Sequence, residues 1–325
     1  MKILITGGAG YVGSMLVQKL ASYGHDIYIV DLCIYDTKLN LSQKNITLYK
    51  SDIRYFDWKI ILERHIDVVY HLAGISNDPG YGVSETVGES VNYIATIRLY
   101  DECIRYQVSK FIYPSSCSVY GRQINKDILL TEENLVNPLT NYARLKIKVE
   151  EYIQSNPKIN YTILRPATVY GYSFRQRFDL VINSFIAHIY YGKNVAVSDV
   201  NNIRPCVYIN DLVDIYIRFL GYDKIDKQIY NVVAQNNSLI ETFQLIKGIL
   251  NSKSCLLNEN NEFSRSYRVC ADKILKLFPD FSYSPFRKGI QTLVDKFNEG
   301  IFYDYEINSN YYGKMRQPVF FSGDK

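Results

Sequence analysis

The segment that most constrains the fold lies at the N-terminus, where a short apolar run at 2–6 (KILIT) leads directly into a glycine-rich turn. Three glycines follow at three-residue spacing, Gly7, Gly10 and Gly13. Apolar residues then recur at helical spacing, at Val12, Leu16 and Leu20. Glycine in a strand–turn–helix of this kind lets backbone N–H groups approach a pyrophosphate, whose charge the positive helix N-terminus favours. The pattern predicts a dinucleotide-binding α/β domain.

An acidic residue at the end of the second apolar run indicates which dinucleotide binds. Asp31 follows the run 27–30 (IYIV) and lies 18 residues beyond Gly13. A carboxylate there can accept hydrogen bonds from the adenosine ribose and would repel the 2′-phosphate of NADP, so NAD is the expected cofactor. Asp52 and Ile53 end the third run and could border the adenine pocket. Capping of the next helix by Asp52 explains that residue equally well.

The first half of the chain alternates between apolar runs and helical patterns, which is typical of a doubly wound parallel sheet (a Rossmann fold) covered on both faces. The expected strands are 2–6, 27–30, 46–49, 67–73, 111–115 and 161–165, and the expected helices are 14–23, 56–64, 89–107 and 140–155.

The second half is smaller and less regular. It has expected helices at 178–191, 211–220, 239–250, 271–278 and 286–299, expected strands at 195–198 and 230–234, and a polar loop at 251–264. We therefore expect an NAD-binding domain at 1–172 with a return segment at about 200–235. Residues 173–199 and 236–325 would form a smaller C-terminal α/β domain for the substrate.

Composition excludes several other classes of protein. The 325 residues include 37 Lys+Arg and 33 Asp+Glu, a net charge of +4 with no basic cluster, which argues against nucleic acid as a partner. No apolar run approaches the roughly 18 residues that span a membrane. Six cysteines without a C-x-x-C and four histidines without an H-x-x-x-H predict reduced thiols, no metal site and a soluble cytoplasmic protein.

Tyr142 and Lys146 are four residues apart in the expected helix 140–155, so their side chains project from one face. An ammonium beside a phenol, together with a positively charged nicotinamide, favours the phenolate. Tyr142 is thus a candidate proton acceptor for a sugar hydroxyl. In a chain with 30 tyrosines the spacing alone could be coincidental.

A run of serines at the end of the strand 111–115 strengthens this interpretation. The segment 113–121 reads YPSSCSVYG and lies at the C-terminal edge of the sheet, where open α/β folds bind ligands. A hydroxyl there could bond the same substrate oxygen that Tyr142 deprotonates, although consecutive serines also form ordinary turns.

These motifs, taken together, resemble the extended short-chain dehydrogenases/reductases of the NAD-dependent nucleotide-sugar epimerase/dehydratase family. The resemblance covers about 270 residues. The motifs that carry it are GGAGYVG at 7–13, HLAG at 71–74, SSCSVYG at 115–121, NYARLK at 141–146, LRPATVYG at 164–171 and RPCVYIND at 204–211.

The resemblance implies catalysis by Ser116, Tyr142 and Lys146 and a homodimer that pairs the helices 89–107 and 140–155. It also implies a set of residues that contact NAD: Gly7, Gly10, Tyr11, Val12, Gly13, Asp31, Asp52, Ile53, Leu72, Ala73, Gly74, Tyr142 and Lys146.

The chemistry implied by the resemblance is oxidation at C4 of a nucleotide-diphosphate sugar, with a 4-keto intermediate. Epimerisation is the favoured outcome, and a 4-dehydrogenase or 4-ketoreductase is the alternative. A 4,6-dehydratase is disfavoured, because Cys117 and Ser118 stand where dehydratases of the family carry Asp-Glu. Cys117 could act as an acid or base, but a buried core cysteine is the preferred interpretation. A catalytically inactive NAD-binding scaffold is the alternative from another class.

The resemblance also marks residues for the substrate. Asn183 matches an asparagine that contacts the sugar diphosphate, and Arg204 and Arg265 match two phosphate-binding arginines. Arg268 competes with Arg265 for that role, and the family pattern is altered after Arg204. Arg175 and Arg177 flank the entrance of the same pocket and could select the nucleotide or the sugar. The preferred interpretation is that both are solvated charges in a loop.

Overall fold

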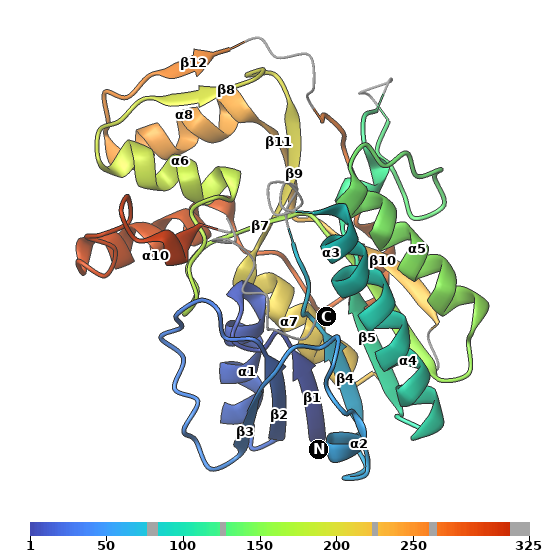
Figure 1. The fold of residues 1–325 in the computed structure, drawn as a ribbon. Helices are drawn as coiled ribbons and strands as arrows, with labels where there is room; N and C mark the ends of the chain where they lie inside the picture. The colour runs from blue at the N-terminus through green and yellow to red at the C-terminus, as the bar shows by residue number, and fades with distance from the viewer. Residues whose placement is uncertain (77–83, 124–127, 223–226, 260–264, 313–325) are drawn as a thin grey trace.

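The computed structural model describes residues 1–76, 84–123, 128–222, 227–259 and 265–312. At its centre is a parallel sheet of seven strands in the order β10-β6-β5-β4-β1-β2-β3 (Figure 1). The strands are β10 (Gln228–Val232), β6 (Asn160–Pro166), β5 (Lys110–Pro114), β4 (Val68–His71), β1 (Lys2–Thr6), β2 (Asp26–Asp31) and β3 (Ile46–Lys50). Their carboxyl ends meet at one edge of the sheet, and the predicted doubly wound Rossmann fold is confirmed.

Helices cover both faces of this sheet. On one face α1 (Tyr11–Ser22) packs beside α7 (Ile209–Leu220), and on the other α4 (Ala95–Arg105) packs beside α5 (Asn141–Ser155) (Figure 1). Each face has a buried apolar core, with Leu16 and Phe219 in one and Leu99 and Val149 in the other. Burial of the apolar stripe of each helix against the sheet is the main stabilising contribution.

The helices expected at 89–107 and 56–64 differ from the structure in extent. The segment expected to be one helix at 89–107 begins earlier, at α3 (Glu85–Glu89), where the Ser84 hydroxyl accepts a hydrogen bond from the Val87 amide. It then passes through a π-helical turn at Ser90–Ile94 into α4. The helix expected at 56–64 is a single turn, α2 (Lys59–Leu62).

The second half packs its own elements around a separate aromatic core that includes Phe178, Phe297 and Phe302. Around this core lie α6 (Val181–Tyr190), α8 (Leu239–Leu250) and α10 (Phe286–Asn298). Helix α9 (Asp272–Leu277) instead packs against β10, and its Ile274 belongs to the core on the α1–α7 face of the large sheet. One small sheet has the order β11-β9-β7, from β11 (Gln235–Ser238), β9 (Ile203–Tyr208) and β7 (Thr168–Tyr170), and another pairs β12 (Leu256–Asn258) with β8 (Val195–Val197).

Several of these strands were not expected from the sequence. The predicted loop 251–264 contains β12, which pairs in parallel with β8. Strand β9 includes Pro205, a residue that lacks the N–H of a regular strand, and its neighbours β7 and β11 are only three and four residues long. Such short strands depend on pairing with distant segments. The proposed boundaries of the two domains stay a prediction.

No helix among the described residues is long and apolar enough to cross a membrane.

Candidate active site

The glycine turn forms a cradle that no larger side chains would permit. Gly7 has a φ of +71°, and a Cβ atom there would lie 2.6 Å from the Ala73 amide nitrogen. A Cβ atom on Gly13 would lie 2.1 Å from the Gly7 carbonyl oxygen. Helix α1 begins at Tyr11, earlier than the predicted start at residue 14, so the amides of its first turn face the space above this turn. The arrangement fits a pyrophosphate.

Asp31 ends β2 beside this turn. Its carboxylate accepts hydrogen bonds from the Ala9 amide (2.9 Å) and from the Cys33 amide (2.8 Å). Burial raises the pKa of Asp31, and these two hydrogen bonds oppose the shift. Two accepted bonds leave further lone pairs on the carboxylate, which could receive ribose hydroxyls.

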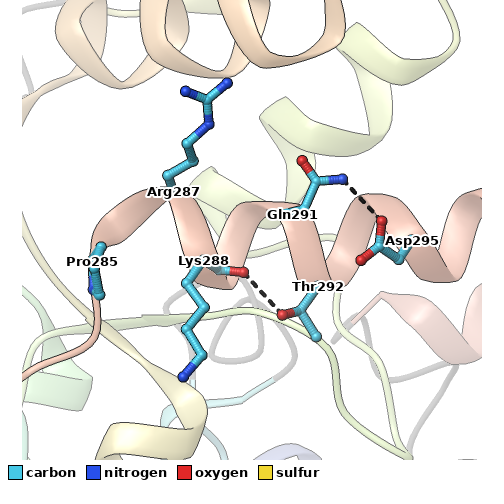
Figure 2. Close-up of a pocket in the computed structure, with 6 residues that line it drawn as sticks. All are labelled: Pro285, Arg287, Lys288, Gln291, Thr292 and Asp295. Carbon is cyan, nitrogen blue, oxygen red and sulfur yellow. Dashed lines mark hydrogen bonds between the residues drawn. The ribbon is translucent and has the colours of Figure 1, made fainter.

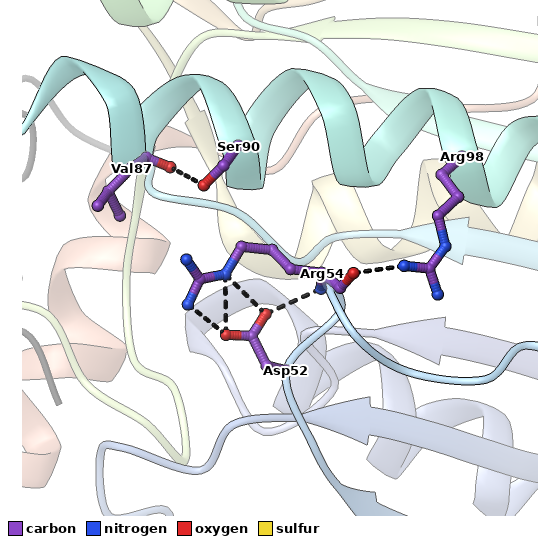
Figure 3. A network of polar contacts seen from close by, with 5 residues as sticks. All are labelled: Asp52, Arg54, Val87, Ser90 and Arg98. Atoms are coloured by element: carbon purple, nitrogen blue, oxygen red, sulfur yellow. Dashed lines mark hydrogen bonds and ion pairs between the residues drawn. The ribbon is translucent and has the colours of Figure 1, made fainter. Parts of the chain in front are cut away.

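Asp52 takes part in a local network at the end of β3 (Figure 3). Its carboxylate accepts hydrogen bonds from the Arg54 amide (2.8 Å) and from the Arg54 guanidinium (2.7 Å from Nη2). Arg98 of α4 donates to the carbonyl groups of Arg54 and Phe56, and so fixes this turn to the helix. Asp52 thus stabilises the turn after β3, and its contact with adenine stays a prediction. The side chain of Ile53 is largely buried in the core, and its contact with the adenine pocket stays a prediction.

The HLAG segment lies against the glycine turn. The Thr6 hydroxyl accepts from the Ala73 amide (3.1 Å) and bonds His71 Nδ1 (2.8 Å), while His71 Nε2 bonds the Thr96 hydroxyl (2.8 Å). Burial lowers the pKa of His71 to about 3, so the imidazole is neutral at physiological pH. The backbone of Leu72 and Ala73 forms the other wall of the cradle around Gly7, and Gly74 packs against the Asn92 side chain.

Ser116, Tyr142 and Lys146 are brought to the carboxyl end of β5. Helix α5 begins at Asn141, capped by the Thr140 hydroxyl, and therefore places Tyr142 in its first turn. Lys146 Nζ donates to the Pro114 carbonyl (2.7 Å) and lies 5.7 Å from the centre of the Tyr142 ring. This hydrogen bond ties the helix to the strand end that carries Ser116.

The environments of Ser116 and Lys146 are compatible with a part in proton transfer. Ser116 Oγ accepts a hydrogen bond from the Ser118 amide (3.1 Å), which leaves its own proton to donate. Burial lowers the pKa of Lys146 to about 7, and the Glu150 carboxylate opposes this shift. A proton on Lys146 is thus readily gained and lost near neutral pH.

The three residues predicted to bind substrate, Asn183, Arg204 and Arg265, lie in the second half of the chain. The Asn183 amide is fully buried and donates to the Tyr11 hydroxyl (3.0 Å) and the Arg177 carbonyl (2.9 Å). It therefore bridges the start of α1 to the segment before α6, and its contact with substrate stays a prediction. The segments of Arg204 and Arg265 are joined by a hydrogen bond from the Ile203 amide to the Ser266 hydroxyl (3.1 Å).

Comparison with known proteins identifies the family of this chain. The family model described as the NAD dependent epimerase/dehydratase family matches residues 3–233. The chain belongs to this family. The NAD dependence of its members agrees with the glycine cradle and Asp31, so the cofactor is NAD.

Individual relatives of this epimerase/dehydratase are distant but cover most of its length. An uncharacterized UDP-glucose epimerase of Bacillus subtilis, YtcB, is 30% identical over 278 residues, 79% of this chain and 84% of the relative. A UDP-glucose 4-epimerase of Lactobacillus helveticus is 28% identical over 247 residues, 68% and 72% of the two chains. The solved UDP-glucuronic acid 4-epimerase of Bacillus cereus, in complex with UDP-glucuronic acid and NAD, has a TM-score of 0.81 at 25% identity and covers 92% and 99%.

The preferred interpretation of Arg175 and Arg177 is wrong. Arg175 and Arg177 are not solvated loop charges, since they are only 4% and 7% exposed. Arg177 forms an ion pair with Asp179 (2.5 Å) and donates to the Ser76 hydroxyl (2.8 Å). The cause is the path of the segment 171–180, which folds inward over α1 before α6 begins at Val181. A helix predicted from residue 178 did not anticipate this path.

The structure also shows buried polar residues near the site that the sequence analysis missed. Glu150 accepts two hydrogen bonds from Arg165, from Nε at 3.0 Å and from Nη2 at 2.6 Å. Arg165 also donates to the Tyr120 hydroxyl (3.0 Å) in the serine-rich motif. The position of Glu150, one helical turn after Lys146, was the signal available in the sequence.

The serine motif itself has two further buried hydroxyls. The Oγ atoms of Ser115 and Ser118 have no hydrogen-bond partner among the described residues. Cys117, between them, is 1% exposed, and its thiol donates to the Arg165 carbonyl (3.0 Å). Burial raises the pKa of the Cys117 thiol, which supports the interpretation as a core residue.

A concave region of about 420 Å³ lies on the exposed side of α10 (Figure 2). It is lined by Pro285, Arg287, Lys288, Gln291, Thr292 and Asp295. Several of these side chains bond within the helix, such as Gln291 to Asp295 (2.9 Å). None of the predicted site residues lines it, so we assign it no part in the reaction.

Proposed function

We propose that this enzyme is a nucleotide-diphosphate-sugar 4-epimerase. The observation that carries the proposal is the hydrogen bond from Lys146 to the Pro114 carbonyl, which places the Tyr142–Lys146 face of α5 over the strand end that bears Ser116. This group of residues lies at the same edge of the sheet as the glycine cradle. A proton acceptor beside a nicotinamide site is the arrangement that oxidation of a hydroxyl requires.

Each residue has a separate task in this proposal. Tyr142 removes the proton from the 4-hydroxyl, and Lys146 stabilises the phenolate by its charge. Ser116 donates a hydrogen bond to the same sugar oxygen, because its Oγ already accepts from the Ser118 amide. The glycine turn and Asp31 would hold NAD, which when bound would supply reversible hydride transfer at C4 of the sugar. Tyr142 then gives the proton back.

The substrate would be held by its diphosphate. Arg204 and Arg265 are both partly buried, and the Ile203–Ser266 hydrogen bond keeps their segments adjacent. Two guanidinium groups can each bind a phosphate in bidentate fashion. We propose these two residues as the diphosphate ligands. We also propose that Asn183, which donates to the Tyr11 hydroxyl, contributes to the substrate site.

The alternatives differ in the step after oxidation. Elimination of water across C5 and C6 would need an acid and a base after Ser116, and Cys117 with its raised pKa and Ser118 supply neither. A 4-dehydrogenase or 4-ketoreductase would use the same three residues with a net change in the cofactor. A catalytically inactive scaffold would not require Ser116, Tyr142 and Lys146, so their presence argues against that alternative.

We also propose a homodimer in which α4 and α5 of the two copies pack together. These helices lie side by side on one face of the sheet (Figure 1), and Ile94, just before α4, is 53% exposed. A measured mass of one chain at micromolar concentration would contradict this.

The test of the reaction uses the purified protein with UDP-, GDP-, CDP- and dTDP-linked sugars, with products followed by NMR and NADH by its absorbance. Epimer formation without net NADH supports the proposal. Formation of NADH in an amount equal to the product would indicate a 4-dehydrogenase. A 4-keto-6-deoxy product would indicate a 4,6-dehydratase, and the absence of turnover with every sugar would indicate an inactive scaffold. A Tyr142→Phe sample processed in parallel controls for contaminating epimerases.

A further inference from the structure

The segment 171–180 crosses over the start of α1. The Ser173 hydroxyl donates to the Tyr11 carbonyl (2.5 Å) and bonds the Ser14 hydroxyl (3.0 Å). The Lys38 amide, in the loop after β2, donates to the Phe174 carbonyl (2.9 Å). Residues 173 and 174 are therefore fixed between the glycine turn and the loop that follows Asp31.

Arg175 comes next and is buried in this position. Its guanidinium lies 4.0 Å from the centre of the Tyr35 ring, and Nε has no hydrogen-bond partner among the described residues. Stacking on a ring uses the flat face of a guanidinium and leaves the N–H groups at its edge free to donate. The neighbouring Asp179 carboxylate is ion-paired with Arg177, and its charge offsets only part of the lowering of the Arg175 pKa.

The charge of Arg175 is poorly compensated. Burial, followed by repulsion from Arg177, lowers the pKa of Arg175 to about 10. Its field reaches Asp31, whose pKa it lowers, but among the described residues the two side chains form no ion pair or hydrogen bond. A buried cation with an unused donor is costly unless an anion meets it.

We propose that Arg175 binds the pyrophosphate of NAD, from the side opposite to the first turn of α1. The backbone amides of the glycine turn and the edge of the Arg175 guanidinium would then hold the diphosphate between them. Because the segment 171–180 leads into α6 of the second half, the cofactor would fasten that half to the Rossmann sheet. The proposal depends on the NAD site and not on which sugar reaction takes place.

Two other anions are less compatible with this position. The 2′-phosphate of NADP would have to lie beside the Asp31 carboxylate, which repels it. The diphosphate of the nucleotide sugar is assigned above to Arg204 and Arg265, in a different part of the second half. Arg175 instead lies beside the predicted NAD site, because it contacts the Tyr35 ring and because the neighbouring Phe174 carbonyl accepts a hydrogen bond from the Lys38 amide in the loop after β2.

The experiment measures binding of ADP, adenosine, NADP and UDP to full-length protein freed of NAD, together with the amount of NAD retained on purification. The variants are Arg175→Gln and Arg175→Lys, with Arg287→Gln on the exposed side of α10 as the control. For Arg175→Gln we expect ADP and NAD affinity to fall by about 10- to 100-fold, as for loss of a charge-assisted hydrogen bond, with adenosine and UDP unchanged. The Lys variant should recover part of the loss.

Three outcomes would overturn the proposal. Unchanged ADP affinity in Arg175→Gln would exclude a pyrophosphate contact. A loss confined to UDP or to NADP would assign Arg175 to the other diphosphate or to the 2′-phosphate. An equal loss of adenosine and ADP binding in both variants, with a lowered melting temperature, would indicate a purely structural role. All of these readouts are independent of epimerase turnover, so failure of the proposed reaction would leave the test intact.

Discussion

The Glu150 carboxylate and the Arg165 guanidinium form an ion pair inside the protein, with both side chains at most 5% exposed. Glu150 is on α5, one helical turn beyond Lys146, and Arg165 is on β6. Because Arg165 also bonds the Tyr120 hydroxyl, the pair joins α5 to the serine motif. The relative position of Tyr142 and Ser116 therefore depends on a buried charge pair that lies behind them.

Arg165→Met should destabilise the protein by about 3–5 kcal/mol, because it leaves the Glu150 carboxylate buried without its partner. Denaturant unfolding monitored by circular dichroism measures the loss. The double variant Glu150→Leu/Arg165→Met should recover most of it, since both charges are then removed. A double variant as unstable as the single one would show that packing, and not the unpaired charge, causes the loss.

The Lys146 side chain should titrate near pH 7 in the NAD-free protein, which NMR of the ¹⁵N-labelled Nζ can follow. The pKa of this group is lower in the folded than in the unfolded chain, whose value is about 10.5, so unfolding takes up a proton between these pH values. The free energy of unfolding from this group thus rises with pH across that window. Glu150→Gln should move the midpoint below 7, and an unchanged midpoint would contradict the proposed influence of Glu150.

Tyr142→Phe should lower kcat by about 10²- to 10⁴-fold, as expected for loss of a general base, while NAD stays bound. Turnover with the accepted sugar and the NAD content of the purified protein are the two measurements. Tyr303→Phe, which changes an 83% exposed ring, serves as the control. Substantial activity in Tyr142→Phe would remove this residue from the proposed role.

Gly13→Ala should abolish NAD binding and lower stability, because the added Cβ would lie 2.1 Å from the Gly7 carbonyl oxygen. The matched control is Gly248→Ala in α8, where no atom lies within 4 Å of the added Cβ. That change should stabilise the helix by roughly 0.5–1 kcal/mol. Melting temperature and NAD affinity are measured for both variants. Normal NAD affinity in Gly13→Ala would contradict the role of the glycine turn in binding NAD.

Cys117→Ala should change kcat by less than about threefold, because the thiol is buried and its raised pKa makes it a poor acid or base near neutral pH. The exposed Cys255 provides the control variant Cys255→Ala. A loss of activity by about 10²-fold or more in the Cys117 variant alone, with unaltered stability, would assign the thiol to proton transfer.

Much of the Rossmann half could be predicted because its signals are local. A parallel strand buried on both faces needs a run of apolar residues, and the runs before Gly7, Asp31 and Ser116 are each continuous. Helix periodicity located α5, and so the Tyr142–Lys146 face, to within one residue. The short strands β7 and β11 have no comparable signal, and β9, which they flank, contains Pro205.

The sequence by itself determined the family, the cofactor and the residue types available for the reaction, because those depend on motifs a few residues long. Only the tertiary structure decided the state of the buried charges. Arg175 and Arg177 read as ordinary loop residues, and the path of 171–180 over α1 removes both from water. Whether a charged side chain is exposed to solvent, ion-paired or buried without a partner depends on segments that come into contact only after folding. No local sequence pattern specifies those contacts.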